Sequence, residues 1–238
     1  MYTVITERER LPKHQNGGIF MKKNLTEMVF ILDKSGSMAD LTKDTIGGFN
    51  SLIRKQRGEE GEALVSAVLF SDSSEVLYDR VPLDKIAPMT DKDYVPAGCT
   101  ALLDAVGDAV KHIGNIHKYA REEDVPEKTI FVITTDGMEN ASRRYSYKEV
   151  KQLIGRQQEK YGWEFIFLGA NIDAAAAAGD LGIKATNAVN YTSDSMGTEV
   201  MYCSAACAVT SLRKTGKLCE DWAEEIRKDE KKRGLRRR

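Results

Sequence analysis

Three short segments of this 238-residue chain carry carboxylate and hydroxyl side chains at spacings that suit a cation site. They are Asp33-Lys34-Ser35-Gly36-Ser37, Gly98-Cys99-Thr100 and Thr135-Asp136-Gly137. Side chains that offer only oxygen suit hard cations, which are Mg²⁺, Mn²⁺ and Ca²⁺, rather than zinc or copper. Magnesium is the ion that we expect first. The candidate metal ligands are Asp33, Ser35, Ser37, Thr100 and Asp136.

This ligand set also predicts what the ion does. If the hydroxyls contact the metal while the carboxylates act through water, the protein leaves the positive charge incompletely neutralised. Such an ion remains electrophilic toward an incoming carboxylate. We therefore expect a site that captures an acidic residue of another protein.

The elements between these segments predict the framework that positions them. Short apolar runs alternate with amphipathic helical patterns, which is typical of a mostly parallel sheet covered by helices on both faces. The buried runs are continuous, as expected for strands buried on both faces. Residues 75–81 follow a turn and end at Pro82, which favours an antiparallel edge strand. The other predicted strands are residues 28–32, 63–70, 129–134, 164–168 and 188–191.

Apolar spacing and capping signals predict the helices. A capping box, Ser146 with Glu149, opens one helix, and the alanine run 174–178 favours another. A last amphipathic helix is expected after Gly216. The apolar stripes of the remaining helices are Ile46, Phe49 and Ile53; Leu102, Val106, Ala109 or Val110, and Ile113; Val200, Cys203, Cys207 and Leu212; and Leu218, Trp222 and Ile226.

Each of the three oxygen-bearing segments leaves the carboxyl end of a predicted strand or opens a helix, where open α/β sheets bind ligands. The pattern D-x-S-x-S at 33–37, a threonine at position 100 and T-D-G at 135–137 resembles the metal-ion-dependent adhesion site (MIDAS) of von Willebrand factor A (vWA) domains. The resemblance covers roughly residues 26–191. It implies a doubly wound, Rossmann-like α/β fold with one antiparallel edge strand.

The resemblance also implies ligand roles. Ser35, Ser37 and Thr100 would coordinate the ion directly, Asp33 and Asp136 directly or through water, and a partner's Glu or Asp would complete the shell. The chain is further similar to small bacterial and phage-borne intracellular vWA proteins, some found with tellurite-resistance or stress genes and others with AAA+ ATPases. An intracellular adaptor role is therefore expected, with an acidic protein as the partner.

Catalysis is the alternative function. A metal-dependent hydrolase acting on phosphorylated substrates would use Asp33 or Asp136 as nucleophile or base. The sequence has no Gly-rich phosphate loop with its lysine and no nucleophile elbow, and Lys34 is expected to be exposed. We therefore expect a binding protein rather than an enzyme.

Other chemical groups favour structural roles. Asp104 is either a second acceptor behind Thr100 or an exposed helix residue, and Asp72 is expected in a turn. Zinc binding by Cys203, Cys207 and Cys219 lacks a nearby histidine, so cysteines packed in a core are the favoured alternative. Cys99 lies at a predicted helix start beside the metal site, where a thiol pKa falls. The histidines His14, His112 and His117 show no catalytic arrangement.

Composition sets the remaining expectations. The formal net charge of -1 gives no general attraction to nucleic acid, and the apolar runs are too short to span a bilayer. Four scattered cysteines without a secretory signal favour a reduced cytoplasm. We expect a leader at residues 1–24, disordered or preceding a true start at Met21, and a vWA domain at 25–215. A C-terminal helix with a frayed basic tail is expected at 216–238.

Overall fold

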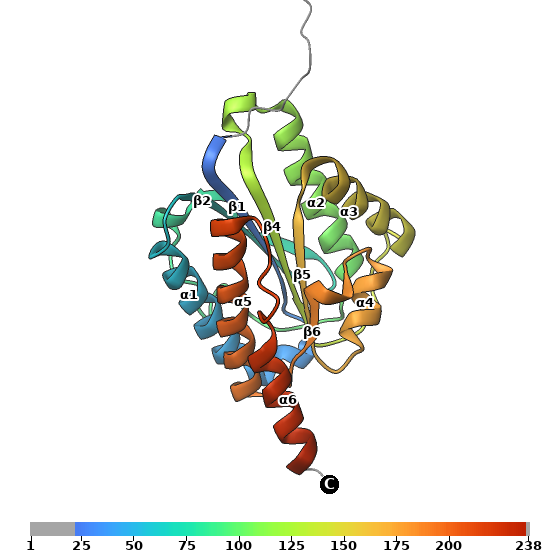
Figure 1. Ribbon diagram of the computed structural model, residues 1–238. Helices are drawn as coiled ribbons and strands as arrows, with labels where there is room; N and C mark the ends of the chain where they lie inside the picture. Colours follow the sequence, from blue (N-terminus) through green and yellow to red (C-terminus); the bar gives the residue numbers. More distant parts are fainter. Residues whose placement is uncertain (1–21, 237–238) are drawn as a thin grey trace, which may run out of the picture.

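A computed structural model describes residues 22–236 of the chain (Figure 1). They form one six-stranded sheet in the order β3-β2-β1-β4-β5-β6. All neighbouring strands are parallel except β2 and β3, so the expected α/β sheet with one antiparallel edge strand is confirmed. The strands are β1 (Lys22–Asp33), β2 (Glu62–Phe70), β3 (Ser74–Pro82), β4 (Pro126–Thr135), β5 (Glu164–Gly169) and β6 (Ala188–Asn190).

The described part of the chain also contains six α-helices and four short 3-10 helices, of which α5 and α6 follow the last strand. The helix α3 begins at the predicted capping box, in which Ser146 and Glu149 each bond the other's backbone. The α-helices are α1 (Thr42–Arg57), α2 (Leu102–Tyr119), α3 (Tyr147–Tyr161), α4 (Ala174–Asp180), α5 (Ser195–Thr215) and α6 (Glu224–Arg236). The 3-10 helices are η1 (Gly36–Leu41), η2 (Leu83–Lys85), η3 (Glu122–Asp124) and η4 (Ala185–Asn187).

Helices cover both faces of the sheet and produce two hydrophobic cores. Side chains of a strand alternate between faces, so Phe30 on β1 packs in the core beneath α1, α5 and α6, whereas Ile31 packs in the core beneath α2, α3 and α4. Figure 1 shows α1 and α5 side by side on one face and α2 and α3 on the other. The central strands are therefore buried on both sides, which explains their continuous apolar sequences.

The order in which the strands are connected indicates which edge of the sheet can bind a ligand. The chain runs from β1 to β2 on one side of β1, and it later enters β4 on the other side. This reversal of direction is the position at which doubly wound sheets form a crevice for ligands at the carboxyl ends of their strands. Asp33 and Thr135 are the last residues of β1 and β4. The first and third candidate segments therefore start side by side.

The two ends of the described chain differ from the expected boundaries. Strand β1 begins at Lys22, inside the segment that we expected as a leader, and residues 1–21 lie outside the described residues. Helix α6 begins at Glu224 rather than near Leu218, and it includes part of the expected frayed tail. Trp222 anchors the preceding turn, because its indole N–H donates to the Thr186 carbonyl at 3.0 Å.

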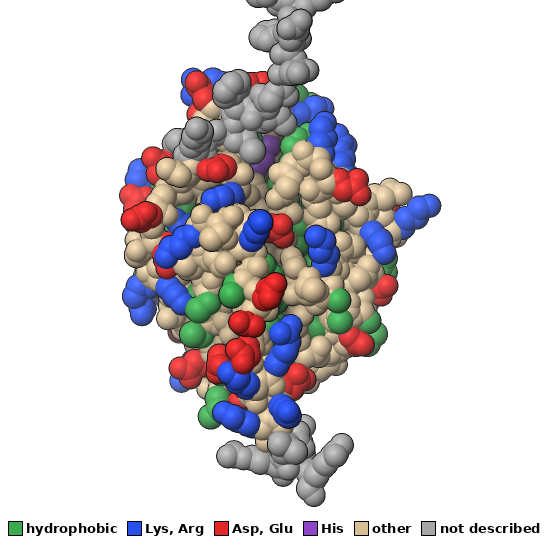
Figure 2. Space-filling view, viewed as in Figure 1, with side chains coloured by type: hydrophobic (Ala, Val, Ile, Leu, Met, Phe, Trp, Pro, Cys, Tyr) green, Lys and Arg blue, Asp and Glu red, His purple; other side chains and the backbone are tan. Residues whose placement is uncertain are grey.

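The surface of the described chain shows no large single-sign region in the view of Figure 2, where Lys and Arg are interspersed with Asp and Glu. This distribution agrees with the formal net charge of -1. Within residues 22–236, no helix is both long and apolar enough to cross a membrane.

Candidate metal centre

Backbone hydrogen bonds hold the first two candidate loops together. After β1 ends at Asp33, the Lys34 N–H donates to the Phe70 carbonyl at 2.7 Å, which ties the loop to the end of β2. The Gly36 N–H then donates to the Gly98 carbonyl at 3.0 Å. A Cβ on Gly36 would stand 3.5 Å from that carbonyl oxygen, so the second loop packs directly on this turn.

Three candidate ligands form a connected set of oxygens. The hydroxyl oxygens of Ser35 and Ser37 lie 3.1 Å apart, and the Ser37 hydroxyl donates to Asp136 Oδ1 at 2.6 Å. Residues far apart in the sequence thus meet at the carboxyl edge of the sheet. Because the Ser37 hydrogen is directed to Asp136, the Ser35 hydroxyl is the donor to Ser37, and one lone pair of the Ser37 oxygen remains available to a cation.

Thr100 approaches the same place from the second loop. Its hydroxyl oxygen lies 3.7 Å from the position that a Cβ on Gly137 would occupy, so it faces the third loop. The Thr100 hydroxyl has no hydrogen-bond partner within residues 22–236 that would occupy its lone pairs. The backbone is fixed instead: the Thr100 N–H donates to Asn140 Oδ1 at 2.9 Å, and the Asn140 N–H donates to the Thr100 carbonyl at 3.0 Å.

Asp33 has a different role from the hydroxyls. Its Oδ1 accepts the Ser35 N–H at 2.7 Å, and its Oδ2 accepts the Thr135 hydroxyl at 2.7 Å. The Tyr94 hydroxyl donates to the Asp33 backbone carbonyl. Both carboxylate oxygens already have donors, so Asp33 orients the loop and adds negative charge beneath it.

The electrostatics of the site favour a cation. Burial raises the pKa of Asp136, and the charge of Asp33 raises it further, against the opposing effect of the Ser37 hydrogen bond. Neither aspartate forms an ion pair with Lys, Arg or His among the described residues. Lys34 is directed away, since its ammonium contacts Glu75 at 2.6 Å. A bound cation would compensate two buried carboxylates that the protein leaves without a positive partner.

The donor chemistry fits a hard divalent ion. No group of three or more His, Cys, Asp or Glu side chains in the described part of the chain is placed to hold a metal. A site here therefore depends on hydroxyl oxygens, which the candidate set supplies from Ser35, Ser37 and Thr100. Oxygen from serine and threonine suits Mg²⁺, Mn²⁺ or Ca²⁺ better than a soft metal.

The loop after β4 contains supporting residues that the sequence analysis did not identify. The Glu139 carboxylate accepts the N–H groups of Leu103 at 2.8 Å, Ala141 at 2.9 Å and Ser142 at 2.7 Å. Together with Asn140, it fixes the third loop against the start of α2. The available signal was the pair of polar residues, Glu139 and Asn140, that follows T-D-G after Met138.

Asp104 fits neither of its two expected roles. It is 7% exposed, and its carboxylate accepts the backbone N–H groups of Arg143, Arg144 and Tyr145 at 2.9 to 3.0 Å. Burial alone would raise the pKa of Asp104, but these three donors and the Arg144 charge outweigh it and lower the pKa. The Asp104 carboxylate therefore anchors the loop that enters α3.

Asp72 lies in the expected turn and also braces the second loop. Its Oδ1 accepts the Cys99 N–H at 2.9 Å. Gly98 adopts a φ of +80°, and a Cβ there would stand 2.1 Å from Asp72 Oδ2. Glycine is required at position 98 for both reasons. Cys99 is an exposed free thiol.

The cysteines of α5 are not packed in a core, which corrects the favoured interpretation of the sequence. Cys203 and Cys207 of α5 and Cys219 in the segment after it are exposed, and Cys207 accepts a hydrogen bond from the Lys55 ammonium at 3.0 Å. The buried stripe of α5 instead contains Tyr202, Ala205, Ala208, Val209 and Leu212. Small residues on several sides of α5 weaken its hydrophobic period, which is why the spacing did not identify the buried side.

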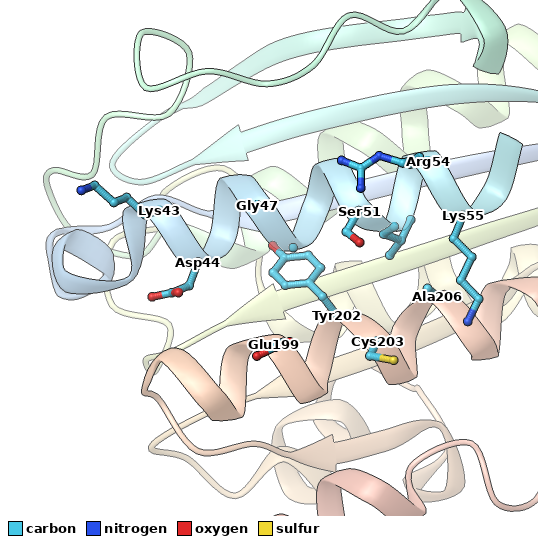
Figure 3. Close-up of a pocket in the computed structure, with 12 residues that line it drawn as sticks. Lys43, Asp44, Gly47, Ser51, Arg54, Lys55, Glu199, Tyr202, Cys203 and Ala206 are labelled. Carbon is cyan, nitrogen blue, oxygen red and sulfur yellow. The ribbon is translucent and has the colours of Figure 1, made fainter.

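A cavity lies between α1 and α5, and no residue of the three candidate metal loops lines it (Figure 3). It has a volume of about 490 Å³ and is lined by Lys43, Lys55, Tyr202 and Cys203 among others. The Tyr202 ring covers Gly48, where a Cβ would stand 2.2 Å from the ring. Its charges are mixed, since Asp44 and Glu199 also line it.

Comparisons with known proteins identify the fold. No family model and no curated protein sequence matches the chain. Solved structures do match: proximal thread matrix protein 1 from the mussel byssus, with a zinc-occupied MIDAS motif, has a TM-score of 0.54 at 16% identity over 78% of this chain and 46% of its own. A von Willebrand factor type A protein from Catenulispora acidiphila has a TM-score of 0.54 at 14% identity, over 80% of this chain and 43% of its own.

The manganese-loaded TRAP protein of Plasmodium vivax has a TM-score of 0.52 at 15% identity, over 79% of this chain and 73% of its own. The chain thus spans less than half the length of the mussel and Catenulispora structures that it matches. At these identities the likeness shows the fold alone. The chain has a vWA-type fold, which confirms the expected architecture.

Proposed function

We propose that this protein is a metal-ion-dependent protein-binding module. Ser35, Ser37 and Thr100 hold a divalent cation, while Asp33 and Asp136 supply the negative charge that retains it. The observation that supports this most is the contact of Ser35, Ser37 and Asp136 at 3.1 and 2.6 Å, beside carboxylates without a positive partner. When bound, the cation supplies an electrophilic position for a carboxylate oxygen of a partner protein.

The structural neighbours support a divalent cation in this position. The mussel protein contains zinc in its MIDAS motif, and the Plasmodium protein is loaded with manganese. For this chain we propose Mg²⁺, with Mn²⁺ or Ca²⁺ as substitutes, because the protein offers only oxygen ligands. The partner residue is an Asp or Glu.

We further propose an intracellular adaptor role of the tellurite-resistance or AAA+ ATPase-linked kind. The sequence resemblance supports this role. The identity of the captured partner would distinguish between the two contexts. An ATPase captured through the ion would favour the motor-linked context, whereas stress or resistance proteins would favour the other.

Titration calorimetry with Mg²⁺ and Mn²⁺ tests the metal site. Wild type should bind one ion, and the Ser35→Ala, Ser37→Ala double variant should lose binding while circular dichroism shows an unchanged fold. Ser51→Ala, an exposed serine of α1, is the matched control and should bind as wild type does. If the double variant binds the ion with wild-type affinity, the proposed ligands are wrong.

An affinity pull-down from host lysate tests the capture of a partner. The three conditions are wild type with Mg²⁺, wild type with EDTA, and the double serine variant with Mg²⁺. A protein retained only in the first condition supports metal-dependent capture. Metal-dependent hydrolysis of a phosphorylated substrate by wild type would instead favour the catalytic alternative.

A further inference from the structure

A small apolar cavity adjoins the candidate metal loops on the side of α4. It has a volume of about 190 Å³, and four parts of the chain line it: Leu102 of α2, residues 137–139 after β4, Tyr147 of α3, and residues between 172 and 181 in and around α4. Leu102 lies two residues after Thr100, and Gly137 directly follows Asp136. The cavity, which we call the α4 notch, is thus continuous in sequence with two candidate ligands.

The size of the α4 notch selects the kind of occupant. Small-molecule sites usually measure about 300–1,000 Å³, so a cavity of about 190 Å³ suits one side chain better than a cofactor. Its floor includes Leu102 and Leu181, which are buried, and its wall includes Ala176 and Ala177 of α4. These surfaces are apolar and would gain from contact with an aliphatic or aromatic group.

Two large apolar side chains stand exposed at the rim of the α4 notch. Met138 is 74% exposed and Tyr147 is 44% exposed, and both line the cavity. Exposed apolar groups that adjoin a polar site mark interaction surfaces more often than isolated ones do. Methionine suits such a surface, because its flexible thioether adapts to different partners.

The loop that presents Met138 is already fixed in place. The Glu139 carboxylate accepts three backbone N–H groups and the Ser142 hydroxyl at 2.7 to 2.9 Å, while Asp104 accepts three more N–H groups farther along. A partner would therefore meet a preformed surface, and little ordering cost would oppose its binding.

The charges around the α4 notch exclude an acidic occupant. Burial raises the pKa of Tyr147, and the negative charges of Glu139 and Asp180 raise it further. Asp173, the N-cap of α4, adds another carboxylate to the lining. A partner's acidic group is therefore attracted to the cation but repelled from the notch.

We propose that the partner carries a large apolar side chain at a fixed position beside its metal-binding Asp or Glu, and that this side chain fills the α4 notch. This inference rests on the proposed metal-dependent function and specifies the partner that the site selects. The acidic residue provides the metal dependence, whereas the apolar residue distinguishes the partner from other acidic segments.

A displayed library of random seven-residue peptides with one fixed central glutamate tests this proposal, with selection in Mg²⁺ and in EDTA. Wild type should enrich Leu, Ile, Met or Phe at one fixed position relative to the glutamate, only in Mg²⁺. Burial of one such side chain is expected to strengthen binding of a selected peptide about tenfold to hundredfold over its serine-substituted form.

Two variants alter the α4 notch without touching a candidate ligand. Ala176→Gln places a neutral, helix-compatible side chain over the cavity, and Met138→Ser removes the apolar rim. Both should retain Mg²⁺ binding by calorimetry and the requirement for glutamate, but lose the apolar preference. Tyr119→Ser, at the far end of α2, is the matched control for loss of an exposed apolar group and should select as wild type does.

The outcomes distinguish a failure of the α4 notch proposal from a failure of the proposed metal-dependent function. Selection that depends on glutamate and Mg²⁺ but shows no apolar preference would overturn the proposal that an apolar side chain fills the α4 notch. It would leave the proposed metal-dependent function intact. An apolar preference that persists in both notch variants would also overturn the α4 notch proposal. Selection that needs neither glutamate nor Mg²⁺ would contradict the proposed function and the inference together.

Discussion

Two carboxylates of β1 lie on the same face of the sheet, and both are almost completely removed from solvent. Glu27 is 0% and Asp33 is 1% exposed. Glu27, near the middle of the strand, is contacted by the Arg80 guanidinium at 2.7 Å and by His117 Nε2 at 2.6 Å. Asp33, at the carboxyl end, has only neutral donors, which are the Ser35 N–H and the Thr135 hydroxyl.

This difference separates a carboxylate that is paired within the fold from one that the proposed cation would pair. The Glu27 cluster holds the Arg80 guanidinium of β3 and the His117 imidazole of α2, so the Glu27 carboxylate serves the packing of these elements. At the carboxyl edge, Asp33 and Asp136 are neighbours without a cationic side chain among the described residues. The protein satisfies their hydrogen bonds but, within residues 22–236, provides no positive side chain for their charge, which the proposed cation would compensate. Buried carboxylates of one strand thus differ in role because of what surrounds them.

The largest expected effect on stability comes from a substitution that breaks the Glu27 cluster. Arg80→Met should lower the free energy of unfolding by about 3–5 kcal/mol, because it leaves a buried carboxylate with only His117 as a partner. Arg80 has a φ of +51°, and Met is equally unbranched at Cβ, so the backbone strain is unchanged. Urea unfolding measures the loss.

Arg121→Met is the matched control for this variant. The side chain of Arg121 is 75% exposed, and its ion pairs with Glu123 and Asp124 lie at the surface. Its removal should leave stability unchanged within error. An equally small change for Arg80→Met would show that the Glu27 cluster does not hold the sheet together.

The second prediction concerns the carboxyl edge of the sheet, where Asp33 and Asp136 have no cationic partner among the described side chains. A divalent cation that binds only the folded protein should stabilise wild type by about 2.7 kcal/mol when its free concentration is one hundred times its Kd. Thermal unfolding in a Mg²⁺ series should show this increase for wild type and Arg121→Met. The Ser35→Ala, Ser37→Ala variant should show none, and an equal increase in it would place the ion elsewhere.

The third prediction concerns Asp104, a buried carboxylate that is not a candidate ligand and that accepts three backbone N–H groups beside the Arg144 guanidinium. Asp104→Asn should lower the free energy of unfolding by about 1–3 kcal/mol at pH 7, since the Arg143 N–H loses its acceptor. The folded state lowers the pKa of Asp104, so its stabilisation is complete above the unfolded pKa and is lost as pH falls through the folded pKa.

Urea unfolding of wild type and Asp104→Asn, compared at pH 7 and in acid, checks both parts of this prediction. The difference between the two proteins should narrow as the pH falls. If the difference in unfolding free energy between the two proteins does not change with pH, the charge of Asp104 does not contribute to stability.

The smallest expected effect concerns Lys34, which lies inside the metal motif but pairs with Glu75. Lys34→Ala should change stability by less than about 1 kcal/mol, because its partner is largely exposed. Its Mg²⁺ affinity by calorimetry should stay within a fewfold of wild type. A large loss of affinity would show that Lys34 acts on the site rather than on the edge strand.

The architecture was predictable because its signals are local. Continuous apolar runs identified the buried strands, and the Ser146 and Glu149 pair identified the start of α3. Helix α6 was misplaced because Trp222 packs from a turn rather than from a helix, and helical spacing does not distinguish the two. The cysteines of α5 were misassigned because small residues lie on both its buried and its exposed sides.

The sequence alone determined the sheet, the order of its loops and the oxygen chemistry of Asp33, Ser35, Ser37, Thr100 and Asp136, since strand periodicity and donor type are properties of neighbouring residues. Only the tertiary structure decided the partners of each charge. Glu27 meets Arg80 and His117 across long sequence separations, whereas Asp33 and Asp136 accept hydrogen bonds from Thr135 and Ser37 hydroxyls. Solvation and charge compensation depend on such distant contacts, and no local pattern encodes them.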